Sequence, residues 1–337
     1  MHDHAALLEA AIRAVADASR VCRLVQANMG KLRAITKADD SPVTVADFAS
    51  QAVVAKRLSE RLGNVILVGE ETSAYLRNPE HAAQLDATLA AAREVWPEAT
   101  EPELLDAIDT GAADTHHTGF WTLDPIDGTK GFLRGEQYAV ALAYIERGEP
   151  VVGVLAGPGL PRDLSMPLDR PDRHGSLYFA IRGGGTYELP SDQSSAHPVK
   201  LLRPERAERE PIRLCASVEK SHTNLTETDR VMQAVDAQAG TRHELVQIDS
   251  QCKYAVVARG QADAYLRLPT RKGYVERIWD HAAGALIASE SGCAVTDARG
   301  RQLDFSHGRG LEKNQGILCA PAREHGLILG AMRSLGV

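Results

Sequence analysis

The feature that most constrains this chain is a pair of aspartates placed directly after a short apolar segment. Residues 120–123 predict a buried strand, and the sequence Asp124-Pro-Ile-Asp-Gly-Thr129 follows it without a break. Pro125 fixes its own φ and biases Asp124 toward an extended backbone. The carbonyl oxygen of Ile126 then becomes available beside the two carboxylates. The sequence therefore predicts a tight turn that presents three oxygen ligands at the end of a strand.

Further carboxylates occupy equivalent positions elsewhere in the chain. Glu70 and Glu71 follow a predicted strand at 65–68, and Asp280 opens a predicted helix at 280–291. Strand ends and helix starts line the ligand crevice of layered α/β proteins. A single such residue would more often be a turn or a helix cap. The joint pattern instead indicates a Mg²⁺ site, because Mg²⁺ prefers hard oxygen ligands.

An anion site is predicted next to these carboxylates. The segment 130–134 can begin a helix directly after Gly128 and Thr129. Backbone N–H groups at a helix N-terminus favour a phosphate, and a glycine lets the backbone approach it closely. A cation site beside a phosphate cradle is typical of an enzyme that hydrolyses phosphate monoesters.

The bulk composition excludes several classes of protein. The net charge of −7 provides no basic excess, so binding to long nucleic acid is not expected. Five scattered cysteines without a CxxC pair argue against a disulfide framework or a structural zinc site. The N-terminus lacks a signal-peptide pattern, and no run of about 18 apolar residues predicts a membrane span. We therefore expect a cytoplasmic protein.

Apolar periodicity divides the chain into two halves. The first half predicts helices at 5–27 and 44–62 and hairpins over 138–157 and 177–189. The Ala-rich segment 77–118 looks like a partly helical surface insertion. Residues 190–209, rich in Pro, Ser and charge, suggest a domain boundary.

The second half alternates strands with helices, which indicates an α/β layer. Strands are predicted near 212–216, 245–248, 264–268, 293–296 and 316–319, and helices near 226–237, 251–259, 280–291 and at the C-terminus. We predict an N-terminal α+β domain at 1–195 and a C-terminal α/β domain at 196–337.

Four polar residues of the second half have two interpretations each. Ser250 and Lys253 match a Ser-x-x-Lys pattern, as do residues 217–220, but no other acylase motif accompanies either match, so phosphate binding suits them better than nucleophilic catalysis. Arg267 lies in an apolar strand and needs a partner, either a structural ion pair or a ligand phosphate. His281 follows Asp280 and could be a metal ligand, although a packed or capping histidine is favoured.

These motifs together resemble the lithium-sensitive inositol monophosphatase superfamily. Within it, the chain is most similar to the 3′(2′),5′-bisphosphate nucleotidases. The superfamily signal lies in the blocks at 40–47, 69–71, 124–137 and 279–284, and the nucleotidase signal lies in those at 217–222, 249–254 and 265–269. The likeness spans almost the whole chain and implies a mixed α/β (α+β) fold, a layered α-β-α-β-α sandwich.

The resemblance also implies a metal centre of two to three Mg²⁺ ions. Glu70, Asp124 and the Ile126 carbonyl would hold the first ion. Asp124, Asp127 and Asp280 would hold the second, and a third, weaker site would involve Glu70 and waters.

The remaining implied roles concern the attacking water and the substrate. Asp47 and Thr129 would position and activate the water, and the amides of Gly128 and Thr129 would bind the scissile phosphate. The implied ligands of the nucleotide and its second phosphate are His222, Ser250, Lys253 and Arg267, with Glu276 as a further candidate.

The function implied by this likeness is removal of the 3′-phosphate of 3′-phosphoadenosine 5′-phosphate to give AMP, with its 5′-phosphosulfate relative as a second substrate. An inositol phosphatase is the enzymatic alternative, and a non-catalytic nucleotide sensor is the alternative from another class. The expected partner is a small phosphorylated nucleotide, without long nucleic acid or membrane, and the choice between monomer and homodimer stays open.

Overall fold

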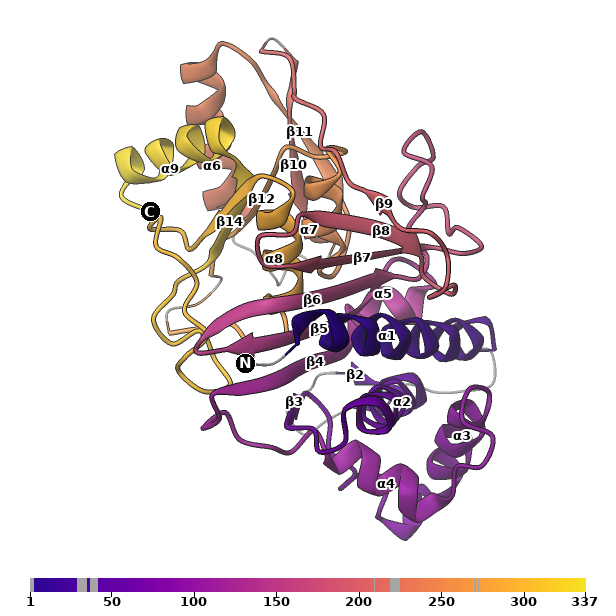
Figure 1. Cartoon of the computed structure of the whole chain (residues 1–337). Coiled ribbons are helices and arrows are strands. Elements are labelled where there is room, and N and C mark those ends of the chain that lie inside the picture. The colour runs from indigo at the N-terminus through magenta and orange to yellow at the C-terminus, as the bar shows by residue number, and fades with distance from the viewer. Residues whose placement is uncertain are drawn as a thin grey trace.

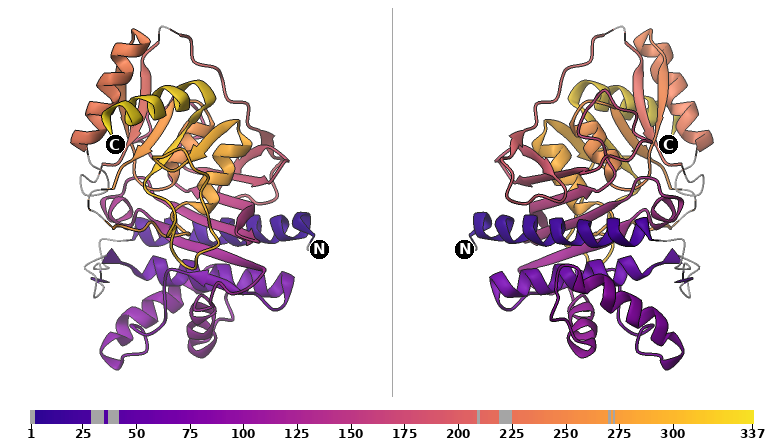
Figure 2. Two further views of the ribbon diagram at one scale, coloured as in Figure 1. Left: turned by 90° about the vertical axis from the view of Figure 1, so that its left-hand side faces the viewer. Right: turned by 90° about the vertical axis from the view of Figure 1, so that its right-hand side faces the viewer.

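The computed structural model describes residues 3–28, 35–36, 42–208, 210–218, 225–269, 271 and 273–337. Two β-sheets alternate with three layers of helices (Figure 1). Helices α1 (His4–Ala27) and α2 (Val45–Leu62) cover one face of the larger sheet. The predicted α-β-α-β-α sandwich is therefore confirmed, and Figure 2 shows its layers from two further sides.

The outer helices form where the sequence predicts them. Asp3 begins α1, because its Oδ1 accepts a hydrogen bond from the Ala5 amide at 3.0 Å. Thr44 and Asp47 form a capping box at the start of α2, which satisfies amides that have no partner within the helix. Gly63 ends α2 with a φ of +78°, a backbone conformation that favours glycine.

The larger sheet has seven strands in the order β3-β4-β5-β6-β7-β8-β9. Only the first pair, β3 and β4, is parallel. The strands are β3 (Leu67–Gly69), β4 (Gly119–Asp127), β5 (Ala139–Glu146), β6 (Glu149–Gly157), β7 (Ser176–Ile181), β8 (Thr186–Pro190) and β9 (Val199–Lys200). The hairpins β5–β6 and β7–β8 confirm both predicted hairpins. A separate short pair joins β1 (Ile35–Thr36) and β2 (Pro42–Val43).

The predicted end of one strand is wrong. We expected the strand before the aspartate motif to stop at residue 123, but β4 continues to Asp127. Asp124 pairs with Ala141 and Asp127 pairs with Ala139. Three residues of advance along β4 are therefore matched by only two residues along β5. This bulge accommodates one extra residue and redirects the chain, which lets both aspartates leave the sheet within one turn.

The interpretation of residues 77–118 as a surface insertion is also wrong. The segment forms η2 (Pro79–His81), α3 (Ala82–Arg93) and α4 (Glu101–Asp109), and both α-helices pack on α2. Leu104 and Ile108 of α4 are completely buried. The chain after α4 also pairs with β3, since the Gly69 amide donates to the Gly111 carbonyl at 2.8 Å. This segment therefore completes the first core.

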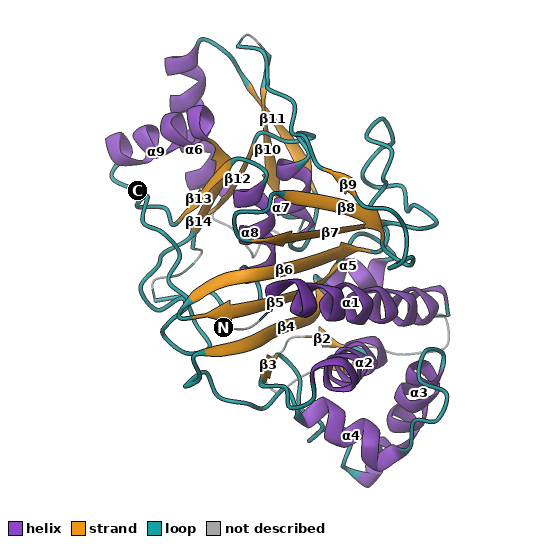
Figure 3. Ribbon diagram, viewed as in Figure 1, coloured by secondary structure: helices purple, strands orange, loops and turns teal. Residues whose placement is uncertain are grey.

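The smaller sheet has five strands in the order β11-β10-β12-β14-β13. They are β10 (Ile212–Ala216), β11 (His243–Gln247), β12 (Ala264–Arg267), β13 (Cys293–Thr296) and β14 (Ile317–Pro321). Helices α6 (Leu225–Ala239) and α9 (Ala322–Leu335) pack together on its outer face (Figure 3). The alternation predicted for the second half is confirmed, and its independence as a domain stays a prediction.

The middle layer consists of α7 (Cys252–Ala258) and α8 (Ala282–Glu290), which lie between the two sheets. Both helices are almost fully buried, and apart from Lys253 of α7 most of the side chains that they bury are apolar. Close packing requires Gly284, because an added Cβ there would lie 2.3 Å from the Tyr254 ring. Gly284 thus lets α8 pack closely against α7. None of the helices in the described part of the chain has the length and apolar character that crossing a bilayer needs.

Candidate active site

Four predicted metal ligands converge at the end of β4. Because β3 and β4 are parallel with Gly69 opposite Leu123, Glu70 and Asp124 leave the larger sheet at the same edge. The Glu70 amide also donates to the Leu123 carbonyl at 3.2 Å. Burial raises the pKa of Asp124 well above its ordinary value, and repulsion from the nearby carboxylates raises it further. These repelling groups are Glu70, Asp127, Asp280 and Asp47.

Asp280 experiences the same electrostatic repulsion, and Asp127 is buried beside it. Burial raises the pKa of Asp280 well above its ordinary value, and repulsion from Asp127 adds to the effect. Burial also raises the pKa of Asp127, although the charge of Lys253 and the backbone N–H of Gln251 oppose it. A divalent cation would relieve this repulsion, and carboxylates are the hard oxygen donors that Mg²⁺ prefers. The residues present therefore fit the predicted metal.

The carbonyl of Ile126 lies inside the same turn. Its amide donates to Asp124 Oδ1 at 3.1 Å, and its carbonyl accepts the Thr129 hydroxyl at 3.2 Å. A carbonyl oxygen has two lone pairs, so a metal could still bind to it. The Thr129 hydroxyl therefore contacts a carbonyl oxygen that is itself a predicted metal ligand. This contact suits the predicted role of Thr129 next to the metal.

Asp47 has a structural task that the sequence analysis did not assign to it. Its Oδ2 accepts hydrogen bonds of 2.7 Å from both the amide and the hydroxyl of Thr44, which caps α2. The side chain is almost completely buried. Its charge is nevertheless close enough to Asp124 to raise the pKa of that group. Asp47 therefore lies near the cluster, and its role with water stays a prediction.

The predicted phosphate cradle begins at a left-handed residue. Gly128 has φ +88° and ψ +42° and precedes α5 (Thr129–Arg134), which confirms the predicted helix. An added Cβ at Gly128 would lie 3.1 Å from the Ser250 Cβ. Both the backbone conformation and this close approach favour glycine. The contact also brings Ser250 of the second half against the metal motif.

Ser250 lies just before α7, and Lys253 lies in the first turn of that helix. Ser250 has a φ of +66°, which is unusual for a residue with a side chain. Lys253 is buried, its Nζ donates to the Ile248 carbonyl at 3.4 Å, and it lies 5.4 Å from the centre of the Tyr265 ring. Burial lowers the pKa of Lys253, while the charge of Asp127 opposes this shift. No carboxylate among the described residues lies within 4.0 Å of this ammonium.

Arg267 forms the structural ion pair that was one of its two interpretations. Its Nε and Nη2 each lie 2.8 Å from a carboxylate oxygen of Glu276. Burial alone would lower the pKa of Arg267, but the charge of Glu276, together with the nearby Tyr265, Asp280 and Tyr274, holds the pKa well above the usual range. A contact between Arg267 and a second phosphate stays a prediction. His222 lies outside the described residues.

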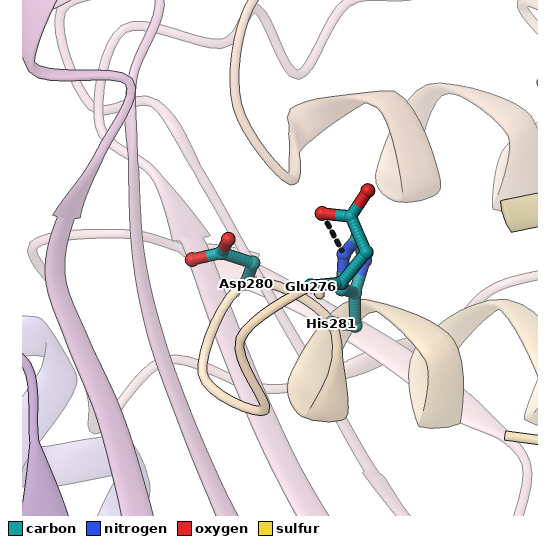
Figure 4. Close-up of side chains that lie close together, drawn as sticks. All are labelled: Glu276, Asp280 and His281. Atoms are coloured by element: carbon teal, nitrogen blue, oxygen red, sulfur yellow. Dashed lines mark hydrogen bonds and ion pairs between the residues drawn. The ribbon is translucent and has the colours of Figure 1, made fainter. Parts of the chain in front are cut away.

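His281 is a packed residue, as the sequence favoured. Its Nδ1 lies 2.9 Å from the Tyr254 hydroxyl and its Nε2 lies 3.3 Å from Glu276 Oε2. Glu276, Asp280 and His281 could place three ligand atoms within 4.8 Å of one another. Figure 4 shows, however, that Glu276 and His281 bond to each other while Asp280 lies to one side. Because both ring nitrogens already have partners, Asp280 belongs with the acidic cluster instead.

Gln251 is a site residue that the sequence analysis missed. Its backbone amide donates to Asp127 Oδ2 at 2.6 Å. Its side-chain Nε2 donates to the Trp279 carbonyl at 2.8 Å, and its Oε1 accepts the Gly284 amide at 3.1 Å. One buried glutamine thus links Asp127 to the turn that carries Asp280 and caps the first turn of α8. No periodicity marks such a residue, since all its partners are remote in sequence.

This fold and this cluster of acids define a layered α/β phosphatase family. Residues 3–335 match the inositol monophosphatase family. The chain therefore belongs to that family, which confirms the resemblance predicted from the sequence.

Relatives in this family carry nucleotidase names. The 3′(2′),5′-bisphosphate nucleotidase of Schizosaccharomyces pombe is 38% identical over 298 residues, covering 85% of this chain and 82% of that protein. The 3′,5′-bisphosphate nucleotidase 2 of Arabidopsis thaliana is 38% identical over 341 residues, covering 97% and 95%. These matches confirm the similarity to the nucleotidase branch.

Solved structures confirm the fold. The extragenic suppressor protein suhB of Bartonella henselae has a TM-score of 0.65 at 18% identity, covering 97% of this chain and 98% of that one. CysQ of Bacteroides thetaiotaomicron, a bacterial member of the inositol monophosphatase family, has a TM-score of 0.61 at 23% identity, covering 93% and 96%.

Proposed function

We propose that this chain is a Mg²⁺-dependent 3′(2′),5′-bisphosphate nucleotidase that converts 3′-phosphoadenosine 5′-phosphate to AMP. Its 5′-phosphosulfate relative would be a second substrate. The observation that carries the proposal is the convergence of four repelling carboxylates beside the buried ammonium of Lys253. Carboxylates that repel one another are stabilised by divalent cations. The buried ammonium of Lys253, which has no acidic partner among the described residues, would be stabilised by a further phosphate. The names of the relatives support the substrate class.

Two groups of ligands would hold the metal ions. Glu70, Asp124 and the Ile126 carbonyl would bind one ion, and Asp124, Asp127 and Asp280 a second, with a third, weaker site at Glu70. Bound Mg²⁺ would supply charge neutralisation at the phosphate and would lower the pKa of a bound water.

The protein groups would position the reaction. In the proposed mechanism Asp47 accepts a proton from the attacking water, and the Thr129 hydroxyl orients that water. The amides of Gly128 and Thr129 hold the scissile phosphate at the start of α5. Water then attacks in line without a phosphoenzyme, so the configuration at a chiral phosphate inverts and solvent oxygen enters the product. Net retention would instead indicate a covalent intermediate.

The second phosphate of the nucleotide would bind on the Lys253 side of the cluster. An ammonium has three donors, and Lys253 uses one for the Ile248 carbonyl among the contacts of the described chain. Ser250 and Arg267 are the neighbouring candidates, together with His222. An inositol monophosphate has no second phosphate to bind there.

A phosphate-release screen tests the proposal directly. Adenosine bisphosphates, inositol phosphates and fructose bisphosphate are compared with and without Mg²⁺. The Lys253→Ala variant should raise the KM for adenosine bisphosphate far more than the KM for an inositol phosphate. Equal effects would support an inositol phosphatase, and nucleotide binding without phosphate release would support a sensor.

A further inference from the structure

Two arginines lie beside the candidate metal centre on the Glu70 side. The guanidinium carbons of Arg277 and Arg309 are 5.8 and 5.0 Å from the centre of the Trp279 ring. Trp279 immediately precedes Asp280, and Arg309 Nη2 donates to the carbonyl of Gly69, which precedes Glu70. Arg277 therefore lies in the segment that leads to Asp280, and Arg309 is hydrogen-bonded to the turn that carries Glu70. Both Asp280 and Glu70 are predicted metal ligands.

The backbone holds both arginines in fixed positions. Arg277 and Gly310 form an antiparallel bridge, and the Ile278 amide donates to the Arg309 carbonyl at 3.2 Å. Successive side chains of an extended segment leave it on opposite sides. Glu276 accordingly reaches Arg267 on one side of this segment, and Arg277 lies on the other.

Neither arginine has an acidic partner among the described residues. Within the portion of the chain that the structure describes, no carboxylate lies within 4.0 Å of Arg277 or Arg309. Carboxylates are not scarce, since the chain has 45 acidic residues against 38 lysines and arginines. Burial lowers the pKa of Arg309, and the charge of Arg277 lowers it further. Two like charges held together without a counter-ion are unfavourable, and an anion between them would remove that cost.

We infer that Arg277 and Arg309 form an anion subsite that binds a phosphate group at the rim of the metal centre. Guanidinium groups match phosphate oxygens with paired N–H donors. Arg309 uses one donor for the Gly69 carbonyl, and Arg277 uses none with the described residues. The subsite goes beyond the proposed function, which places the nucleotide's second phosphate near Lys253. Its phosphate would come from the released product, or from the substrate's second phosphoryl group if that group binds here instead of near Lys253.

The Arg277→Ala variant tests this inference. Arg277 is exposed and makes no side-chain hydrogen bond with the described residues, so its loss should leave the fold intact. Arg13→Ala, at an exposed position of α1 remote in sequence, is the matched control for loss of one positive charge. Calorimetric titration of the Mg²⁺-loaded protein with inorganic phosphate measures the subsite without turnover. The Kd should rise about tenfold or more in Arg277→Ala, as for one lost charge-assisted contact, and stay unchanged in Arg13→Ala.

Kinetics distinguish the two sources of the phosphate. If the product occupies the subsite, Arg277→Ala weakens inhibition by inorganic phosphate and leaves the KM for adenosine bisphosphate unchanged. If the substrate's second phosphoryl occupies it, the KM for adenosine 3′,5′-bisphosphate rises and that for adenosine 3′-monophosphate does not. The inference is overturned if the Kd for phosphate and both KM values stay within about twofold of the parent in Arg277→Ala and in Arg309→Gln. Because calorimetry needs no hydrolysis, it still tests the subsite if no nucleotide is cleaved.

Discussion

Replacing Gln251 with alanine would separate the two turns that carry Asp127 and Asp280. The substitution removes the donor to the Trp279 carbonyl and the acceptor for the Gly284 amide, which lie 2.8 and 3.1 Å from the Gln251 side chain. It keeps the backbone hydrogen bond to Asp127. The turn before α8 therefore loses its tie to the end of β4, while the fold around it remains.

The expected magnitude follows from these two lost bonds. Each buried backbone group left without a partner costs about 1–3 kcal/mol, so the free energy of unfolding should fall by about 2–6 kcal/mol. Residues that orient metal ligands typically change metal affinity by about 10–100-fold when they are replaced. We therefore expect Gln251→Ala to need roughly 10-fold more Mg²⁺ for half-maximal phosphate release.

Two measurements and a control variant at another buried glutamine distinguish a role of Gln251 in positioning the metal ligands from a role in stability alone. Mg²⁺ binding is followed by calorimetry, and unfolding is followed in denaturant. Gln137→Ala is the control, because buried Gln137 donates to the Gly159 and Leu168 carbonyls at 3.1 and 2.7 Å but bonds to no predicted metal-ligand turn. It should lose stability and keep its Mg²⁺ affinity. If Gln251→Ala is destabilised but binds Mg²⁺ like the parent, the positioning role is refuted. If the alanine variant does not fold, Gln251→Glu replaces it, because glutamate retains an acceptor for the Gly284 amide.

Three further predictions concern the charges of the site. Asp124→Asn should abolish phosphate release yet raise the melting temperature of the metal-free protein by roughly 2 °C or more, because it removes the cost of keeping an acid protonated in this buried, repelling environment; an unchanged or lower melting temperature would contradict this. The raised pKa values of Asp124 and Asp280 mean that the folded metal-free protein holds protons that the unfolded chain releases, so its stability falls as pH rises through those values. The increase in melting temperature on adding Mg²⁺ should thus be larger near about pH 8 than near about pH 6, and a pH-independent increase would exclude metal binding at these acids. Glu276→Gln leaves buried Arg267 without its ion pair and should cost about 3–5 kcal/mol in denaturant unfolding, whereas a neutral result would show that the pair is dispensable.

The sequence was sufficient to predict the fold and the acidic cluster for one physical reason. The predicted ligands adjoin elements with a clear apolar pattern, since Glu70 follows β3, Asp124 and Asp127 lie at the end of β4, and Asp280 precedes α8. Strand ends at one edge of a sheet lie together, so residues remote in sequence become neighbours. The predicted hairpins and the α/β alternation needed only local periodicity, and the structure contains both.

The features that could not be predicted depend on tertiary contacts. Residues 77–118 have a polar, Ala-rich composition, and only their packing on α2 shows that Leu104 and Ile108 complete the core. The extension of β4 to Asp127 depends on a bulge against β5, which leaves no pattern in the sequence. Gln251 was missed because its partners are a carboxylate and two backbone groups from other segments.

The distribution of positive charge around the acidic cluster explains why one site could hold both cations and phosphates. Glu276 cancels the charge of Arg267, so Arg267 adds little net attraction for an anion. Lys253 has no such partner among the described residues, and its ammonium lies close enough to Asp127 to lower the pKa of that acid. Without metal, the acids would repel a phosphate and Lys253 would serve to stabilise Asp127. With metal ions neutralising the acids, the same ammonium would become available to an anion, so metal and substrate binding should reinforce each other.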